Sequence, residues 1–237
     1  MLCLILAGGL GTRMQGVADG TAKTLIPVAG RPFADHQLTW LAGQGVTRVI
    51  YAIGHRGEQI RDFVGDGGRW GLKVDYVDEG ETLLGTGGAV RHVVGNTGIG
   101  IDEGFLLLYG DSYLNIDVPA VWAASGGGAF PVMCVLKNEG RWDASNAVFA
   151  DGRVRLYEKG RVDAAAIGME YIDYGLSVLT PVIVREAIPA GGKGDLTEIF
   201  GPLAASGGLR GFEATERFYE IGSPEGLADL EALLTST

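Results

Sequence analysis

The sequence LAGGLGTRM at residues 6–14 follows directly on an apolar run that begins at Leu2. The run has the composition of a buried strand, and the glycines after it predict a strand-to-loop turn. Gly8, Gly9 and Gly11 allow the backbone to turn sharply and to bring its N–H groups close to an anion. The same glycines also fit an ordinary turn, because the chain contains 40 glycines.

Two basic side chains, Arg13 and Lys23, accompany this loop, and TLIPVAGRP follows at residues 24–32. Fixed cations beside a glycine-rich loop suit a triphosphate. The loop is not a Walker loop, because no Gly-Lys-Ser/Thr follows a G-x-x-x-x-G spacing. GGLGTR combined with Lys23 and PVAGRP favours phosphate binding over a plain turn.

Length and composition indicate one globular α/β domain, with 237 residues of which 46% are hydrophobic. The apolar runs are shorter than the ~20 residues that span a membrane. The N-terminus lacks the basic stretch of a signal peptide. The sequence contains no hexapeptide repeat, so we expect no fused acetyltransferase domain. Cys3 and Cys134 lie in strand-like apolar runs, which predicts buried free thiols. We therefore expect a cytoplasmic protein.

The net charge of −10 argues against a general binder of nucleic acid or of anionic membranes. The first 31 residues differ, because they hold Arg13, Lys23 and Arg31 against Asp19 alone. A small cationic patch on an acidic body suits a small anionic ligand accompanied by a divalent cation. The acidic surface is compatible with a monomer or a homodimer.

Strand-like runs alternate with helical patterns, which indicates βαβ units and a mainly parallel sheet covered on both faces. The expected strands lie at residues 2–7, 47–53, 73–78, 105–109, 130–136 and 171–179, with short ones at 146–149 and 153–157. The expected helices lie at residues 33–44, 58–64, 86–94, 195–206 and 224–234, with Pro32 at the first position of one. We predict a Rossmann-like three-layer α/β/α domain of residues 1–237, with lobes at 1–115 and 116–237.

A second glycine-rich segment, LGTGGA at residues 84–89, lies between a strand and a helix. The small residues Gly85, Thr86 and Gly87 would let a flat base lie against the backbone at a helix N-terminus. An ordinary strand-to-helix turn with Thr86 as its cap explains the segment equally well.

A carboxylate ends the strand of the third segment, FLLLYGD at residues 105–111. At the carboxyl end of a strand, Asp111 is placed to meet a hard cation bound to phosphate oxygens. The alternative is that Asp111 begins a turn with Ser112. Near the C-terminus, Ser223 and Pro224 predict the N-cap and first residue of a helix.

Together these segments resemble the sugar-1-phosphate nucleotidyltransferases, whose signature loop has a form close to GGxGTR…PK. The resemblance covers nearly the whole chain, and Ala22 stands where that family usually has Pro, which predicts a less rigid loop. It implies a nucleotide-diphospho-sugar transferase fold, a Mg²⁺ cofactor, and nucleoside triphosphate and sugar 1-phosphate as partners. The nucleotide-binding residues that it implies are Leu6, Ala7, Gly8, Gly9, Gly11, Thr12, Arg13, Lys23, Gly85, Thr86 and Gly87.

The resemblance also implies catalytic roles for Arg13, Lys23 and Asp111. Asp111 and Glu220 would hold Mg²⁺, with Glu220 in the place that the family usually gives to Asp. The implied residues for the sugar phosphate are Asp111, Glu158, Lys159, Tyr174 and Gly175. By spacing alone, the Glu158–Lys159 pair fits an exposed hairpin end, and YIDYGLSVL at residues 171–179 fits core packing.

The expected reaction transfers a nucleoside monophosphate from a nucleoside triphosphate to a sugar 1-phosphate and releases pyrophosphate. LGTGGA, GDS and FYEIGSPEG look most like the guanylyltransferases of heptose 1-phosphate and mannose 1-phosphate. The alternatives are an N-acetylmuramate 1-phosphate uridylyltransferase, a cytidylyl- or guanylyltransferase for a non-sugar phosphate of the molybdenum cofactor or phosphocholine type, and a non-catalytic nucleotide-sugar sensor.

Overall fold

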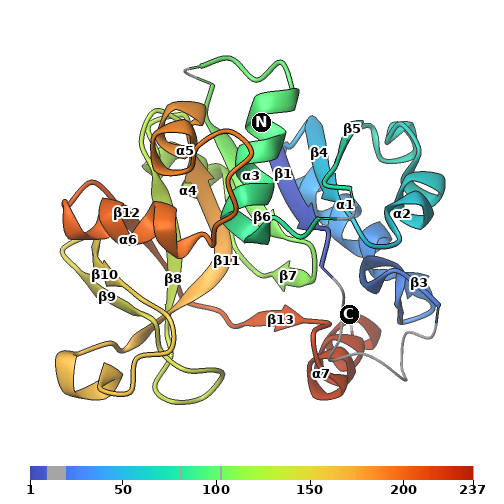
Figure 1. The fold of residues 1–237 in the computed structure, drawn as a ribbon. Coiled ribbons are helices and arrows are strands. Elements are labelled where there is room, and N and C mark those ends of the chain that lie inside the picture. Colours follow the sequence, from blue (N-terminus) through green and yellow to red (C-terminus); the bar gives the residue numbers. More distant parts are fainter. Residues whose placement is uncertain (10–19, 81, 102, 237) are drawn as a thin grey trace. The chain divides into compact units, whose positions relative to one another are not determined.

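The computed structural model describes residues 1–9, 20–80, 82–101 and 103–236, and its contacts divide the chain into two compact units (Figure 1). Unit 1 consists of Met1–Leu83, Leu108–Asn115 and Phe218–Thr237, and unit 2 consists of Leu84–Leu107 and Ile116–Arg217. The expected boundary near residue 115 is therefore incomplete. The C-terminal segment belongs with the first lobe, and residues 84–107 belong with the second.

Unit 1 is built on a parallel sheet in which β4 lies between β1 and β5. Its elements are β1 (Leu2–Ala7), η2 (Lys23–Leu25), β2 (Pro27–Val28), β3 (Arg31–Pro32), α1 (Phe33–Gly43), β4 (Arg48–Ile53), α2 (Gly57–Val64), η3 (Gly68–Trp70), β5 (Lys73–Asp78), β7 (Ser112–Leu114), β13 (Phe218–Glu220) and α7 (Pro224–Thr235). Strands β1 and β4 are buried over most of their length, as expected of parallel strands covered on both faces. Cys3 is one of these buried residues.

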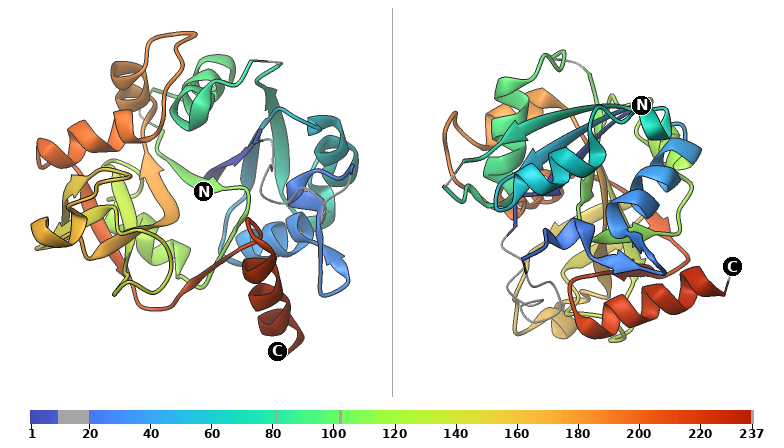
Figure 2. Two further views of the ribbon diagram at one scale, coloured as in Figure 1. Left: turned by 60° about the horizontal axis from the view of Figure 1, so that its bottom comes forward. Right: turned by 90° about the vertical axis from the view of Figure 1, so that its right-hand side faces the viewer.

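The C-terminal segment joins unit 1 through a second, smaller core. β13 pairs antiparallel with β7, which places Glu220 opposite Ser112. Val28, Phe33, Ile221 and Leu230 are buried together. The right-hand view of Figure 2 shows α7 alongside the β2–β3 hairpin. This packing is the reason that the last 20 residues group with the start of the chain.

Helix α7 begins as the sequence predicts. Ser223 Oγ accepts a hydrogen bond from the Gly226 N–H at 3.0 Å, and Pro224 is the first helical residue. The cap, three residues after Glu220, sets the direction in which the chain leaves β13. Glu220 therefore lies between a paired strand and a capped helix.

Unit 2 is built on a mixed sheet with the strand order β11-β8-β12-β10-β9. Its elements are α3 (Gly85–Asn96), α4 (Val118–Ala124), β8 (Val132–Lys137), β9 (Ala147–Ala150), β10 (Arg153–Tyr157), η4 (Ala164–Ile167), β11 (Tyr171–Leu179), α5 (Pro181–Ala187), α6 (Thr197–Ala205) and β12 (Arg210–Ala214). β8 runs antiparallel to β11 and parallel to β12. Strand β6 (Phe105–Tyr109) is divided between the units after Leu107. Helix α3 packs on α5 and α6, which explains why residues 84–107 group with unit 2.

The expected strands and helices are all present, and their ends differ from the expectation by at most a few residues. Helix α1 begins at Phe33 with Pro32 as its N-cap, so Pro32 is not the first helical residue. Cys3 and Cys134 are buried free thiols, as expected. The short elements β2, β3, β7, α4, α5, β12 and β13 were not anticipated, because runs of two to seven residues carry too little periodicity.

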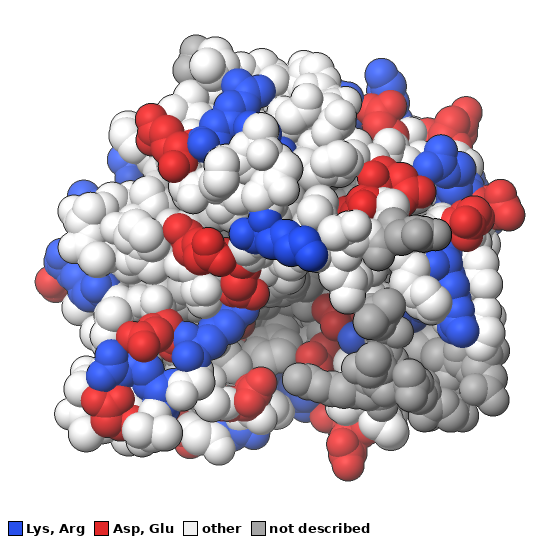
Figure 3. Space-filling model, viewed as in Figure 1, with Lys and Arg blue, Asp and Glu red and all other residues white. Residues whose placement is uncertain are grey.

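Charges of both signs interleave on the face of the molecule in Figure 3. On this face the picture shows no broad basic patch among the described residues. Within the residues that the structure describes, no helix is both long and apolar enough to cross a bilayer.

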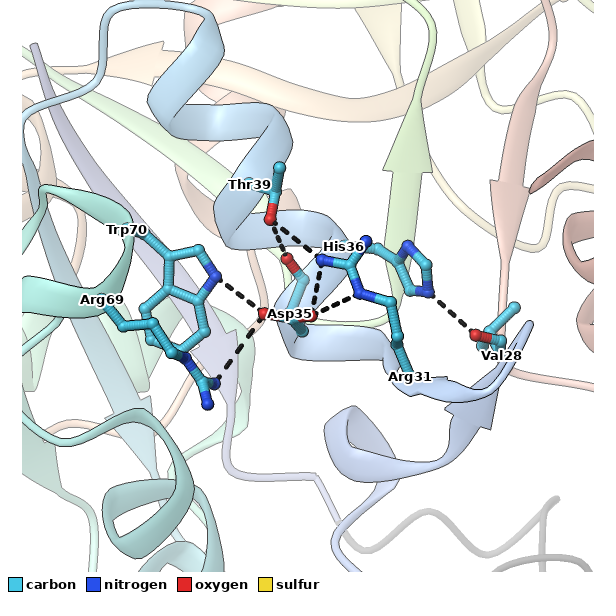
Figure 4. Close-up of polar contacts among 7 residues, drawn as sticks. All are labelled: Val28, Arg31, Asp35, His36, Thr39, Arg69 and Trp70. Carbon is cyan, nitrogen blue, oxygen red and sulfur yellow. Dashed lines mark hydrogen bonds and ion pairs between the residues drawn. The ribbon is translucent and has the colours of Figure 1, made fainter. Parts of the chain in front are cut away.

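A polar network around Asp35 connects the β2–β3 hairpin, α1 and η3 (Figure 4). Asp35 accepts hydrogen bonds from Arg31 Nε at 2.6 Å and from Trp70 Nε1 at 2.9 Å, and Arg69 lies 3.8 Å away. Burial by itself raises the pKa of Asp35. The hydrogen bonds from Arg31 and Trp70 and the nearby Arg charges outweigh burial and hold that pKa below its ordinary value.

We predict that Asp35→Asn lowers the melting temperature by about 2–4 °C near neutral pH, which corresponds to about 1 kcal/mol. A carboxyl whose pKa is lowered by folding stabilises the protein above its unfolded-state pKa and loses that effect as pH falls through the folded-state value. The difference between variant and wild type should therefore shrink between about pH 5 and pH 3. Thermal unfolding across this range measures it, with exposed Asp62→Asn on α2 as the control. A difference that does not change with pH would contradict the electrostatic explanation.

Candidate functional site

The predicted phosphate-binding segment is described only in part. Leu6 and Ala7 end β1, and Gly8 and Gly9 follow it. The remaining predicted residues of this segment, Gly11, Thr12 and Arg13, lie outside the described residues. Their roles stay predictions from the sequence.

Gly8 and Gly9 have different surroundings. A Cβ on Gly8 would overlap the Glu79 carboxylate, and a Cβ on Gly54, just after β4, would lie 3.0 Å from the Gly8 carbonyl oxygen. Gly8 and Gly54 thus approach each other closely where β1 and β4 end. Around the Cβ position of Gly9, no described atom lies within 4 Å.

The predicted metal carboxylate, Asp111, lies in a two-residue turn between β6 and β7. The N–H of Gly110 donates to the Leu6 carbonyl oxygen at 2.9 Å, and a Cβ on Gly110 would overlap that oxygen. On the other side, the Asp111 carbonyl accepts from the Ile221 N–H at 3.0 Å. Asp111 is thus both a turn residue and a strand-end carboxylate, so the two interpretations of the sequence are compatible.

Lys23 and Asp111, 88 residues apart in sequence, form an ion pair with 2.5 Å between Nζ and Oδ2. Their side chains are 22% and 32% exposed, so the pair is partly shielded from solvent. Partial burial strengthens the attraction between the charges, because screening by water is weaker there. The predicted phosphate-binding lysine and the predicted metal carboxylate therefore lie at one place in unit 1.

Glu220 belongs to the same place. A Cβ on Gly222 would lie 3.2 Å from Lys23 Nζ and 3.2 Å from Glu220 Oε2, so both side chains border the glycine. We call Lys23, Asp111 and Glu220 the Lys23 cluster. The sequence predicted each member separately, and the structure brings them together.

The donor set of the Lys23 cluster fits Mg²⁺. Its two carboxylates, of Asp111 and Glu220, offer the oxygen ligands that this ion prefers, and Mg²⁺ usually takes only one or two carboxylates together with water and substrate phosphates. No larger group of His, Cys, Asp and Glu suited to a metal occurs among the described residues. Lys23 adds a positive charge for phosphate oxygens.

Gln37 supports the turn that carries Asp111, and sequence reasoning missed it. The side chain is fully buried in α1, and its Nε2 donates to the carbonyl oxygens of Tyr109 at 3.2 Å and Ser112 at 2.9 Å. These two residues flank the Gly110–Asp111 turn. The available signal was a polar residue on the helix face that buries Ala34 and Leu38.

The glycines of the LGTGGA segment contact unit 2 itself. The N–H groups of Gly87 and Gly88 donate to the Gly194 carbonyl oxygen at 2.9 and 3.1 Å. A Cβ on Gly85 would overlap that oxygen, and a Cβ on Gly87 would lie 2.7 Å from the Asp195 carbonyl oxygen. These glycines admit the loop that ends at Asp195, in contrast to the expectation that their surfaces lie open to a base.

Thr86 is not the cap of α3, because the helix begins at Gly85. Thr86 Oγ1 accepts from the Leu196 N–H and donates to Asp195 Oδ2, both at 3.0 Å. The predicted nucleotide-binding residue Thr86 therefore belongs to a polar contact with the start of α6. Nucleotide binding by Gly85, Thr86 and Gly87 stays a prediction.

Glu158 and Lys159 directly follow β10, and each is paired with an opposite charge. Glu158 Oε2 lies 2.9 Å from Arg161 Nη1, and Lys159 Nζ lies 3.6 Å from Asp195 Oδ1. Both side chains are nonetheless exposed, so these surface ion pairs fit the hairpin-end interpretation as well as the predicted sugar-phosphate role. Through Asp195, Lys159 is connected to Thr86.

Asp195 combines a capping role with this charge contact. Its N–H donates to Glu198 Oε1 at 3.0 Å, and its Oδ1 accepts from the Thr197 N–H, at the first residue of α6, at 2.9 Å. Burial alone raises the pKa of Asp195. The Thr197 N–H, the Lys159 charge and the Thr86 hydroxyl together hold that pKa below its ordinary value. Asp195 is thus a carboxylate at neutral pH beside the predicted phosphate-binding lysine.

Tyr174 does not present its side chain to solvent. It is 1% exposed, and its hydroxyl donates to the Arg217 carbonyl oxygen at 3.4 Å. The Tyr174 side chain thus packs in the interior, and sugar binding by Tyr174 stays a prediction.

Gly175, the next predicted residue, has a φ of +93°, which favours glycine. Its N–H donates to Asp173 Oδ1 at 3.0 Å, and the Tyr157 hydroxyl donates to Asp173 Oδ2 at 3.1 Å. The register between β11 and β8 shifts between Asp173 and Ser177. Asp173 is therefore the organised polar side chain of this stretch, and it was missed because alternation alone indicates core packing.

We predict that Gly110→Ala destabilises the protein by about 1–3 kcal/mol and lowers the melting temperature by about 3–10 °C, because the new methyl group overlaps the Leu6 carbonyl oxygen. The matched control is Gly9→Ala, whose methyl group meets no described atom within 4 Å. Thermal unfolding of both variants measures the effect. Equal melting temperatures would show that the β1–turn contact is not tight.

Comparison with known proteins agrees with this arrangement. Residues 3–192 match the family described as "MobA-like NTP transferase domain". A glucose-1-phosphate thymidylyltransferase of Streptomyces griseus is 34% identical over 48% of the chain and 31% of its own length. A D-glycero-alpha-D-manno-heptose 1-phosphate guanylyltransferase of Campylobacter jejuni is 32% identical over 50% of the chain and 51% of its own length. The matches thus span about a third to a half of these relatives.

The crystal structure of HddC from Yersinia pseudotuberculosis has a TM-score of 0.79 and 25% identity, covering 98% of the chain and 99% of HddC. This likeness confirms the expected α/β fold of the nucleotide-diphospho-sugar transferases. The family match covers most of the chain, and the Lys23 cluster brings together the predicted phosphate-binding and metal-binding side chains. The chain therefore belongs to the MobA-like NTP transferase family.

Proposed function

We propose that the protein transfers a nucleoside monophosphate from a nucleoside triphosphate to a sugar 1-phosphate. A phosphate oxygen of the sugar 1-phosphate attacks the α-phosphorus in line, the bond between the α-phosphorus and the bridging oxygen breaks, and pyrophosphate leaves. The observation that carries the proposal is the Lys23 cluster, where the Lys23 ammonium pairs with Asp111 and borders Gly222 together with the Glu220 carboxylate. The two units act as one nucleotidyltransferase domain.

The residues of unit 1 bind the triphosphate. Lys23 holds the α-phosphate region, and Asp111 and Glu220 are the residues that would hold Mg²⁺. When bound, Mg²⁺ neutralises charge on the phosphate oxygens. Arg13, whose role rests on the sequence alone, stabilises the departing pyrophosphate. The glycines that follow β1 would let backbone N–H groups approach a phosphate.

The chain needs no nucleophile of its own for this reaction, because the attacking oxygen belongs to the substrate. Catalysis then depends on positioning the two phosphates and on stabilising charge that moves to the leaving group. The bonds from Gln37 and the Gly110 contact with β1 restrict the position of Asp111. A restricted carboxylate requires less reorganisation during the reaction.

The residues of unit 2 bind the sugar phosphate. Lys159 binds the phosphate, Glu158 binds sugar hydroxyls, and Asp173 joins them as an acceptor beside Gly175. Lys159 has a carboxylate partner in Asp195, and a dianionic phosphate competes with that carboxylate for the ammonium. The acidic body of the protein disfavours nucleic acid and anionic membranes as partners, and a monomer or a homodimer suits the reaction equally.

For the substrates, we propose GTP with heptose 1-phosphate or mannose 1-phosphate. The chain is also similar to the crystal structure of HddC complexed with GMP-PN, with a TM-score of 0.78 and 26% sequence identity. N-acetylmuramate 1-phosphate with UTP is the second candidate, because a uridylyltransferase for that sugar from Neisseria meningitidis is 34% identical over 52% of the chain and 52% of its own length. Other relatives have thymidylyl and uridylyl names, so the names differ in both base and sugar.

The test is pyrophosphate release with Mg²⁺ from each of the four common nucleoside triphosphates against about ten sugar 1-phosphates, with choline phosphate and molybdopterin included. An active pair with a sugar 1-phosphate supports the proposal. Activity with a non-sugar phosphate alone would replace it with the alternative transferase. Triphosphate binding without turnover across the grid would favour a nucleotide-sugar sensor.

We predict that Asp111→Asn lowers kcat by about 10²–10³, because it removes a charge that acts on the transferring phosphates. The fold is retained, since the Gly110 and Gln37 contacts use backbone atoms of the turn. Arg13→Ala should lower kcat by a similar factor. Steady-state kinetics with the active pair measures both, and normal turnover of either variant would remove that residue from the mechanism.

We predict that Lys159→Gln raises the KM for the sugar 1-phosphate by about 10–100-fold, the equivalent of one charge-assisted hydrogen bond, and leaves the KM for the triphosphate unchanged. The matched control is Lys193→Gln, which removes a lysine from the loop beside Asp195. Initial rates over a matrix of both substrates separate the two KM values. A change confined to the triphosphate KM would place Lys159 on the nucleotide.

A further inference from the structure

We propose that Gln59, on α2, is a positioning residue that holds the backbone leading into Lys23 and so sets where the lysine ammonium reaches. The proposal rests on the proposed function, because Lys23 is taken there to bind the triphosphate. Gln59 Oε1 accepts from the Ala22 N–H at 2.7 Å, and Gln59 Nε2 donates to the Gly20 carbonyl oxygen at 2.8 Å. One carboxamide thus bonds both ends of the segment Gly20–Ala22, as a neighbouring strand would.

Arg56 bonds the middle of the same segment, because its Nη1 donates to the Thr21 carbonyl oxygen at 3.0 Å. Arg56 precedes α2 with a φ of +59°, a left-handed conformation that is unfavourable for a residue other than glycine. Arg56 has this conformation at the position from which its side chain bonds the Gly20–Ala22 segment. Every residue of Gly20–Ala22 is therefore held by a side chain from the start of α2.

Lys23 depends on this attachment because its own turn is short. It begins the three-residue 3₁₀ turn η2, which no side chain caps, and the Leu25 N–H donates to the Ala22 carbonyl oxygen at 2.8 Å. A single 3₁₀ turn has little stability of its own. Gln59 holds the N–H of Ala22 and the turn holds its carbonyl, so the direction of Lys23 follows from both.

The hydrogen bond to Gln59 restrains the backbone of Ala22, as the ring of a proline at this position would do covalently. Ala22 has a φ of −60°, the value that a proline ring would impose at this position. Ala22→Pro would keep the backbone angle and remove the N–H that donates to Gln59. If Gln59 acts by restraining Ala22, a proline ring at position 22 should make the Gln59 hydrogen bond dispensable. If Gln59 only stabilises the fold, proline at position 22 should not change the effect of removing Gln59.

The experiment uses the full chain and its active substrate pair. Gln59→Ala should lower kcat by about 10–30-fold with little change in the KM for the sugar 1-phosphate, because the lysine is displaced and the second substrate is not. Gln59→Glu should fall between, since a carboxylate still accepts from the Ala22 N–H and cannot donate to the Gly20 carbonyl. Exposed Glu58→Ala, one residue away on α2, is the matched control and should retain wild-type rates.

The decisive variant is the double substitution Ala22→Pro with Gln59→Ala. Its kcat should lie within about threefold of Ala22→Pro alone, since proline already restrains residue 22. A full additional loss of 10–30-fold in the proline background would overturn the positioning role. Melting temperatures of all variants exclude general unfolding as the cause.

A second measurement separates this proposal from the proposed function. The Kd for inorganic tripolyphosphate with Mg²⁺ is determined by calorimetry for wild type, Lys23→Met and Gln59→Ala. Weaker binding by Lys23→Met and, to a smaller degree, by Gln59→Ala supports positioning even without turnover by any substrate pair. Wild-type binding and rates in Gln59→Ala, with Lys23→Met impaired, would overturn the inference about Gln59 alone. Wild-type behaviour of Lys23→Met would overturn both proposals.

Discussion

The ion pair between Lys23 and Asp111 is the interaction on which unit 1 converges. It joins η2 to the turn between β6 and β7, and each partner is held by bonds that do not involve its own charge. In the Asp111 turn, the Gly110 N–H donates to the Leu6 carbonyl and the Asp111 carbonyl accepts from the Ile221 N–H. The carbonyls on either side of the turn accept from Gln37. Because hydrogen bonds to backbone atoms hold the Asp111 turn, the Lys23 and Asp111 side chains can exchange their partners while the backbone stays in place.

A half-buried pair of opposite charges is not in itself a strong source of stability, since the cost of desolvation offsets much of the attraction. The position of the pair at the end of a buried strand therefore favours a role for the charges in binding. A third charge, on Glu220, borders Gly222 together with the Lys23 ammonium. One ammonium against two carboxylates leaves net negative charge. Such a site attracts a divalent cation, and the cation in turn attracts phosphates.

The sequence predicted the main strands and helices from apolar runs and helical periodicity, and it marked Lys23 and Asp111 as a basic residue near the glycine-rich loop and a carboxylate at a strand end. Glu220 followed only from the family resemblance, because the short strand β13 that carries it has no local signal. The sequence did not predict Gln37 or Gln59, whose side chains act on backbone atoms that are 72 and 37 residues away. Nor did it predict which surface each glycine serves. Gly85 and Gly87 look identical to a base-binding backbone until the loop that ends at Asp195 is known to fill the space.

The same distinction explains why the class of reaction is easier to recognise than the substrates. Phosphate binding needs a glycine turn, a lysine and carboxylates, all of which leave marks in a sequence. In the proposed function, the sugar 1-phosphate is read by individual contacts such as those of Asp173 and Lys159, whose partners Tyr157 and Asp195 come from other elements. Such contacts leave no local pattern in the sequence, and similar proteins carry thymidylyl, guanylyl and uridylyl names. Substitutions that change the sugar should thus be sought around Asp173, because that residue is not proposed to contact a phosphate.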